Sequence, residues 1–207
     1  AAGIAFACVA TSCTYADPAT AADNTRKTHE YVDLAADLGA PAIRVFGGKI
    51  GGGWSRDRAI DEVAKALASV ADHARERGVA VCMETHDDWC DPVHVAAVMR
   101  QVGKPSIALN SDIMHPVRAP GYARTAAYEP SRSWIRHVHF HGGAEENGKL
   151  VLKPIGQGIV DHAVAVKLLA AAGYGGFLSG EWIDWAIPAE RHLPDEIAKM
   201  RSFEPRR

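Results

Sequence analysis

The segment DRAIDEVAKALASVADHARERGVAVCME, residues 57 to 84, holds one complete helix-to-strand unit and decides the fold class. Apolar residues recur in its first part at three-and-four spacing, which predicts an amphipathic helix over 57–77 with Gly78 as its C-terminal stop. The apolar run VAVCME (79–84) then predicts a buried strand that ends on an acidic side chain, Glu84. A helix that leads through a glycine into such a strand is the repeating unit of α/β proteins.

The same alternation continues along the chain in both directions. Helical patterns predict further helices over roughly 20–38, 91–102 and 160–172. Short apolar runs between most of the helices predict the other strands, at 4–10, 42–46, 106–110, 135–140 and 176–181. This order gives a parallel sheet, which is either an open doubly wound sheet or a closed (β/α) barrel.

Polar residues at the strand ends favour the barrel. Glu84, Asp112, His139 and Glu181 each lie at or just past the carboxyl end of a different predicted strand, where a barrel carries its chemistry. No GxGxxG motif follows the first strand to suggest a dinucleotide site. Because a barrel needs eight strands, we expect one or two units to precede residue 1 or to escape detection.

The strand at 79–84 has two unlike faces. Its bulky residues, Val79, Val81 and Met83, alternate with smaller ones and are expected to contact the helices. The smaller set points into the barrel and brings Glu84 to the rim. The same parity directs Arg44 inward, where we expect it to be a buried partner of a carboxylate. It also directs inward Asn110, Asp112, His137, His139, His141, Phe177, Ser179 and Glu181.

Composition limits the classes of partner. The 207 residues, 47% hydrophobic and 23% charged, fit a single domain over 1–207. The net charge of -2 and the lack of a basic run argue against a nucleic-acid partner. There is no export signal and no apolar run of the ~20 residues that a membrane helix needs. Four cysteines without a CxxC pair suit a reducing compartment, so we expect a cytoplasmic protein without a membrane partner.

Three carboxylates and one imidazole at the strand ends predict a site for one divalent metal ion. Mostly oxygen ligands suit a hard to borderline cation, with Mn²⁺ as the first choice and Mg²⁺, Co²⁺ or Zn²⁺ as alternatives. The simpler interpretations are solvated loop carboxylates, a turn capped by Asp112 and a packed His139.

Six blocks of the sequence resemble, in order, the sugar phosphate isomerase/epimerase superfamily of xylose-isomerase-like TIM barrels. They are YVDLAADLGAPAIRVFGG (31–48), VCMETHDD (81–88), IALNSDIMHP (107–116), IRHVHFHGG (135–143), LVLKPIGQGIVD (150–161) and LSGEW (178–182). The resemblance implies that Glu84, Asp112, His139 and Glu181 are the metal ligands. The opening segment resembles the second strand of the family, so the first βα unit is expected to be missing. The open seam would then favour a partner surface such as a homo-oligomer.

The resemblance implies an isomerase or epimerase of a ketose or related sugar, or of a sugar phosphate. Glu84 and Glu181 would be catalytic, one taking and the other returning a proton beside a carbonyl, through an enediolate that the metal stabilises. Alternatives on this fold are a metal-dependent dehydratase of the inosose type and a catalytically inactive sugar-binding barrel. An abasic-site endonuclease is opposed by the net charge and by the absence of histidines from the early strands.

Other residues are candidates for contact with the sugar. His115 matches a position that holds substrate oxygens in relatives, and His86 shares the direction of Glu84. His141 is left open between a substrate contact and a support for a ligand. The glycine-rich segment 46–57 is interpreted as a lid from which Lys49, Trp54 or Arg56 reaches the substrate, with a phosphate cradle as the alternative. We expect a packed His137, a long active-site loop over 113–134, and surface positions for His29, His73, His94, His162 and His192.

Overall fold

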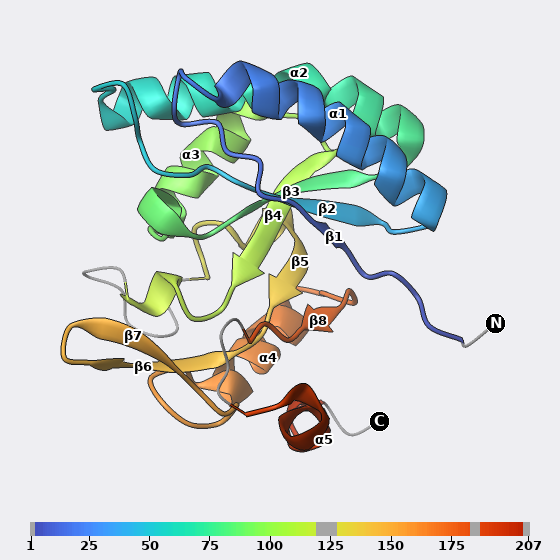
Figure 1. The fold of residues 1–207 in the computed structure, drawn as a ribbon, viewed down its shortest axis with the longest axis vertical. Helices are drawn as coiled ribbons and strands as arrows, with labels where there is room; N and C mark the ends of the chain where they lie inside the picture. Colours follow the sequence, from blue (N-terminus) through green and yellow to red (C-terminus); the bar gives the residue numbers. More distant parts are fainter. Residues whose placement is uncertain (1–2, 119–127, 183–186, 205–207) are drawn as a thin grey trace.

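The computed structural model describes residues 3–118, 128–182 and 187–204. Six parallel strands form one curled sheet in the order β1-β2-β3-β4-β5-β8 (Figure 1). Their bounds are β1 Val9–Ala10, β2 Ala42–Phe46, β3 Ala80–Glu84, β4 Ile107–Asp112, β5 Ile135–His139 and β8 Leu178–Ser179. A closed barrel of this type has eight strands. The described sheet is therefore part of a barrel wall, with β1 and β8 as its two edges.

Four helices follow the predicted pattern. They are α1 Ala21–Leu38, α2 Arg56–Arg77, α3 Pro92–Val102 and α4 His162–Ala171. At the start of α2 the Ser55 side chain accepts a hydrogen bond from the Arg58 amide, and the helix ends at Gly78 with φ +71°. That left-handed conformation is open to glycine, which explains why the helix stops there. The helices α1, α2 and α3 lie along one side of the sheet (Figure 1).

The two edge strands are shorter than predicted, and some elements were not predicted. The runs at 4–10 and 176–181 contain only the two-residue strands β1 and β8, because each edge strand has one pairing partner. An antiparallel hairpin of β6 Gly142–Glu146 and β7 Lys149–Lys153, and the helix α5 Ala189–Arg201, are additional. The expected loop 113–134 has short 3-10 helices at Pro116–Arg118 and Arg132–Trp134, while 119–127 lie outside the described residues.

Two layers of apolar residues confirm the predicted parity of β3. Val79, Val81 and Met83 belong to the large core between sheet and helices. Inside the curl, Cys82 packs in a small cluster with Ala42 and Ala108. Small side chains fit there because the inward positions of a barrel converge on its axis.

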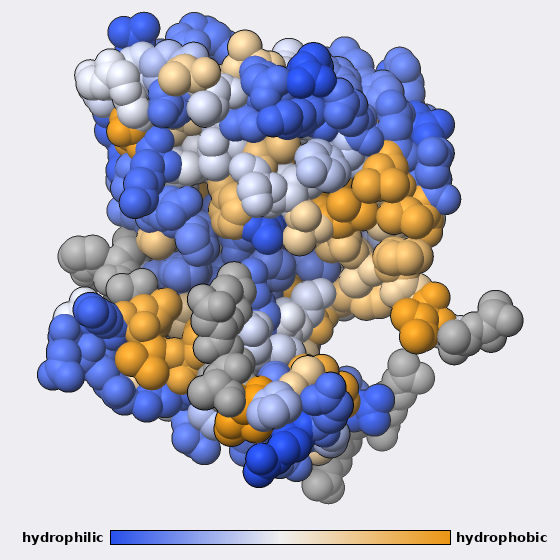
Figure 2. All heavy atoms as spheres, viewed as in Figure 1, coloured by the Kyte–Doolittle hydropathy of each residue, from blue (hydrophilic) through white to orange (hydrophobic). Residues whose placement is uncertain are grey.

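The surface of α1 and α2 is mostly hydrophilic (Figure 2). Hydrophobic surface gathers in this view on the side from which the N-terminal segment emerges. Exposed apolar side chains of the segment and of α1 include Ile4, Phe6, Leu34 and Leu38. In the part of the chain that the structure describes, no helix is both long and apolar enough to span a bilayer.

Candidate metal centre and substrate cavity

Four strand-end residues meet at one point. Glu84, Asp112 and His139 are the last residues of β3, β4 and β5, and Glu181 follows β8 by two positions. The parallel register sets Asp112 beside His139 and His139 beside Ser179. One ligand atom from each of the four lies within 4.8 Å of those of the others. The arrangement gathers three carboxylates around one imidazole.

His139 lies between the two glutamates. Its Nδ1 is 2.9 Å from Oε1 of Glu84 and 3.1 Å from Oε2 of Glu181. Burial alone would lower the pKa of His139, but the hydrogen bonds and charges of Glu181 and Glu84 raise it to about 10. Glu84 is 1% exposed and Glu181 is 21% exposed, so only Glu181 is open to solvent.

Arg44 supports Glu84 from the barrel interior, as the parity of β2 predicted. Its Nε lies 3.4 Å from Oε2 of Glu84, and its guanidinium lies 4.0 Å from the centre of the Phe46 ring. Oε2 of Glu84 has no hydrogen-bond partner among the described residues. This buried oxygen is therefore available to a cation.

Asp112 is fully buried and held on both oxygens. Oδ1 accepts hydrogen bonds from the backbone amides of Met114 (2.7 Å) and His115 (3.0 Å), and Oδ2 lies 2.6 Å from Nε2 of His141. Burial would raise the pKa of Asp112, but His141, His115 and the hydrogen bonds hold it well below its usual range. His141 thus contacts a candidate ligand.

The residues present fit a divalent cation. Three carboxylates within 4.8 Å of each other repel, and Arg44 compensates one negative charge. Three oxygen donors and one imidazole match the preference of a hard to borderline ion. Asp112, His115 and His141 form a second group whose ligand atoms are also within 4.8 Å, and it shares Asp112 with the first.

A cavity of about 230 Å³ adjoins the cluster at Glu181. The ring centres of His86 and His115 are 4.3 Å apart, and Nδ1 of His86 is 3.2 Å from Oδ1 of Asp87. All three histidines proposed from the sequence as substrate contacts line this cavity. The described lining residues are His86, Met114, His115, His141, Leu150, Leu152 and Glu181.

The structure does not bring Lys49 and Trp54 to this cavity. Lys49 is exposed, and Trp54 packs partly buried with the Arg58 guanidinium 5.2 Å from its ring centre. The glycine-rich segment is fixed against Trp89, whose Nε1 donates to the Gly48 carbonyl at 2.8 Å. A Cβ at Gly47 would lie 2.2 Å from the same indole. Close packing against Trp89 therefore explains the glycine at position 47.

Two of the remaining histidines contradict the prediction of a surface position. His162 and His192 are buried, whereas His137 is buried as expected and burial lowers its pKa to about 4. His162 donates from Nε2 to the His141 carbonyl at 3.0 Å and accepts from the Gly156 amide at Nδ1. The residue is the first of α4, and the helical pattern alone does not show this contact.

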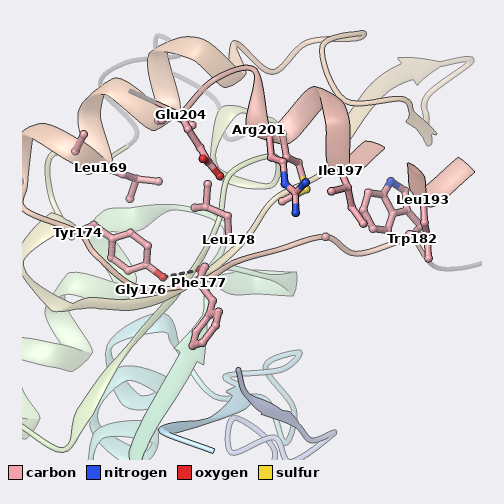
Figure 3. Close-up of a pocket in the computed structure, with 14 residues that line it drawn as sticks. Leu169, Tyr174, Gly176, Phe177, Leu178, Trp182, Leu193, Ile197, Arg201 and Glu204 are labelled. Atoms are coloured by element: carbon pink, nitrogen blue, oxygen red, sulfur yellow. Dashed lines mark hydrogen bonds between the residues drawn. The ribbon is translucent and has the colours of Figure 1, made fainter. Parts of the chain in front are cut away.

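A larger cavity, of about 620 Å³, lies between α4, β8 and α5 (Figure 3). Leu178 points into it, whereas Phe177 points to the other side of the strand, in agreement with the predicted inward parity of Phe177. Its wall is apolar, with side chains such as Leu169, Leu193 and Ile197. None of the four candidate ligands lines it, whereas Glu181 lines the smaller cavity.

Comparisons with known proteins agree with this fold. A family model described as "Xylose isomerase-like TIM barrel" matches residues 2–203. Among curated proteins, none matches the sequence significantly. A crystal structure of a protein from Sinorhizobium meliloti 1021 is 21% identical, with a TM-score of 0.80, covering 97% of this chain and 78% of its own.

Two other solved structures share the fold. A xylose isomerase-like TIM barrel protein from Mycobacterium smegmatis, in complex with magnesium, is 20% identical, with a TM-score of 0.76, over 98% of this chain and 75% of its own. The 3-keto-D-glucoside 4-epimerase from E. coli is 16% identical, with a TM-score of 0.77, over 97% and 80%. This chain therefore spans three quarters to four fifths of the lengths of these three structures.

Proposed function

The chain belongs to the xylose isomerase-like TIM barrel family, and from this premise we propose that it is a divalent-metal-dependent isomerase or epimerase of a ketose or a related sugar. The observation that carries the proposal is the position of the two glutamates. Both Glu84 and Glu181 contact the same nitrogen of His139, at 2.9 and 3.1 Å. Two carboxylates that flank one point suit a reaction in which one takes a proton and the other returns it.

Glu84, Asp112, His139 and Glu181 would hold the ion. A divalent cation in such a site polarises a carbonyl and stabilises negative charge that develops on oxygen. Mn²⁺ is our first choice, with Mg²⁺, Co²⁺ or Zn²⁺ as alternatives. The structure in complex with magnesium shows that a neighbour of the same fold binds such an ion.

The chain's own residues account for substrate access and proton transfer. Glu181 lines the cavity, so it can reach a proton on the carbon beside the substrate carbonyl. Glu84 is held by Arg44, whose Nε lies 3.4 Å from its Oε2. Return of the proton to the other face of the same carbon inverts that centre and gives epimerisation. Return to the neighbouring carbon gives isomerisation.

His86, His115 and His141 would orient the sugar from the lining of the cavity. Imidazole nitrogens both donate and accept hydrogen bonds, which suits hydroxyl groups. His141 is also bonded to Asp112, so it would link the substrate to a metal ligand.

The metal is tested first, by elemental analysis of protein purified without chelators. We expect about one equivalent of divalent metal in the wild type and its loss in His139→Ala, because the imidazole is the only nitrogen donor of the four-residue group. The absence of metal in both proteins after addition of Mn²⁺ would contradict the proposal.

The proton transfer is tested by deuterium exchange from solvent into ketoses, measured by mass spectrometry. Glu84→Gln and Glu181→Gln should each abolish metal-dependent exchange, whereas Glu76→Gln on the exposed surface of α2 should retain it. Unchanged exchange in both site variants would remove the glutamates from the mechanism. Product absorbance from an enone or diketone would indicate a dehydratase instead, and sugar binding without exchange would indicate an inactive barrel.

A further inference from the structure

The cavity beside Glu181 is lined by two unlike sets of side chains. One set is the imidazoles of His86, His115 and His141. The other is the hydrocarbon surface of Met114 and of the β7 residues Leu150 and Leu152. The hairpin that carries these leucines lies beyond the carboxyl ends of β4 and β5 (Figure 1). The two leucines of the lining thus come from an element outside the barrel sheet.

The apolar lining is fixed by close backbone packing. A Cβ at Gly143 would lie 2.4 Å from Sδ of Met114 and 3.0 Å from Cδ1 of Leu150, so only glycine lets these two side chains meet. Gly143 also pairs with Leu152 across the hairpin, and its carbonyl accepts from the Ile159 amide at 2.8 Å. These contacts hold the leucines toward the cavity.

The described lining contains no lysine or arginine. Two cations of the neighbouring strands are engaged with carboxylates, since Arg44 faces Glu84 and Lys153 pairs with Glu146 at 2.5 Å. Residues alternate along a strand, so Lys149, Val151 and Lys153 face away from the side of Leu150 and Leu152. The imidazoles have acidic neighbours, with His141 bonded to Asp112 and His86 beside Asp87.

Burying a phosphate against leucines is costly, because a charged group there loses hydration and gains no partner. A volume of about 230 Å³ is also below the ~300–1,000 Å³ of typical ligand pockets. The imidazoles suit hydroxyl groups, and the leucines suit C–H surface or a methyl group.

From these features we infer that the substrate is an unphosphorylated, monosaccharide-sized ketose, whose end farther from the glutamates lies with its hydrocarbon surface against Leu150 and Leu152. This inference rests on the proposed function and adds the substrate class to it. A deoxygenated end should be accepted at least as well as a hydroxymethyl end, and a terminal phosphate should be rejected.

The test compares ketopentoses and ketohexoses, their terminal deoxy analogues and their terminal phosphate esters, on the Mg²⁺-loaded protein. Binding is measured by calorimetry, and turnover by solvent deuterium exchange. For the best sugar, we expect the phosphate ester to bind about tenfold more weakly or worse, because burying its charge costs at least that factor. The deoxy analogue should bind equally well or more tightly.

Two lysine variants in strand β7 test whether the apolar lining of the cavity causes the preference for the free sugar. Leu152→Lys should shift the ratio of phosphate to free-sugar affinity by about tenfold toward the phosphate, because it adds a cation to the cavity wall. Val151→Lys adds the same charge to the opposite face and should leave the ratio unchanged.

Wild-type preference for the phosphate ester, or an equal shift in both lysine variants, would overturn the inference while leaving the proposed isomerase intact. The absence of binding and exchange with either class of sugar would instead overturn the proposed function itself. The two failures are therefore distinguishable.

Discussion

At the scale of single residues, His141 connects the cavity to the candidate metal site. Its Nε2 lies 2.6 Å from Oδ2 of Asp112, and His162 donates to its carbonyl. Removal of a group that orients a metal ligand typically lowers metal affinity by roughly 10–100-fold. We therefore expect His141→Ala to weaken Mn²⁺ binding by about this factor, measured by calorimetry. His29→Ala, on the distant helix α1, is the control, and equal affinities in both variants would contradict the role.

His162 predicts a dependence of stability on pH. Burial lowers its pKa below the ordinary value of 6.5, so the unfolded chain binds more protons than the folded protein just below that pH. The free energy of unfolding should thus fall as the pH falls through 6.5. His162→Gln lacks this group, so between about pH 7.5 and 5.5 it should lose less stability than the wild type in urea titrations. Parallel losses would show that His162 does not contribute.

Residue roles were predictable from the sequence where they follow from strand parity. Arg44 and His139 face inward because successive side chains of β2 and β5 point to opposite faces of the sheet, and this alternation is predictable from the sequence. Leu150 and His162 were not identified, because their roles depend on contacts between elements that are distant in the sequence. For Lys49 and Trp54, the glycine-rich composition suggested a lid over the substrate, whereas neither residue lines the cavity and Gly47 allows close contact with Trp89.

At the scale of elements, the hairpin β6–β7 depends on a close backbone approach at Gly158. A Cβ there would lie 2.1 Å from the Gly143 carbonyl oxygen, and φ is +84°. Gly148, in the turn of the hairpin, has φ +73° but no atom within 4 Å of such a Cβ. Gly148→Ala should cost about 1–2 kcal/mol for the left-handed conformation alone.

Gly158→Ala carries the same strain and also a clash with backbone, so it should destabilise the protein clearly more than Gly148→Ala. Urea unfolding of both variants isolates the clash, since the conformational cost is common to them. Equal losses of stability would mean that the loop at Gly158 can move away from the hairpin without cost.

Most helices were predictable because their signals are local. Apolar residues at three-and-four spacing, followed by a stop glycine, predict both ends of α2 to within one residue. The hairpin also carried a signal, the Asn147-Gly148 pair between two short runs, which adopts positive φ at both positions and is typical of a two-residue turn. Helix α5 contains Pro194, which removes a backbone donor inside the helix and obscured its pattern.

At the scale of the whole molecule, the candidate metal site joins four strands of the sheet. Its residues end β3, β4 and β5 and follow β8, which pairs only with β5 over Leu178 and Ser179. The order of the strands was predictable from successive βα units. The lengths of the edge strands were not predictable, because the pairing of an edge strand depends on contacts with elements outside the sheet.

An ion bound to these ligands should stabilise the whole fold. It would offset repulsion among three carboxylates and connect the edge strand β8 to the centre of the sheet. At a hundredfold excess over the dissociation constant the gain is about 2.7 kcal/mol, which raises the unfolding temperature of a protein of this size by roughly 5–10 °C. Scanning calorimetry with MnCl₂ should show this rise in the wild type. KCl of equal ionic strength should not reproduce it.

His139→Ala and Glu181→Gln should lack the rise, because each removes a ligand atom from the group within 4.8 Å. If His139→Ala kept the full rise, the stabilising ion would bind elsewhere, and the group of Asp112, His115 and His141 would be the next site to test. If Glu181→Gln alone kept it, the ion would bind to β3, β4 and β5 without β8. Glu181 would then be left for proton transfer alone.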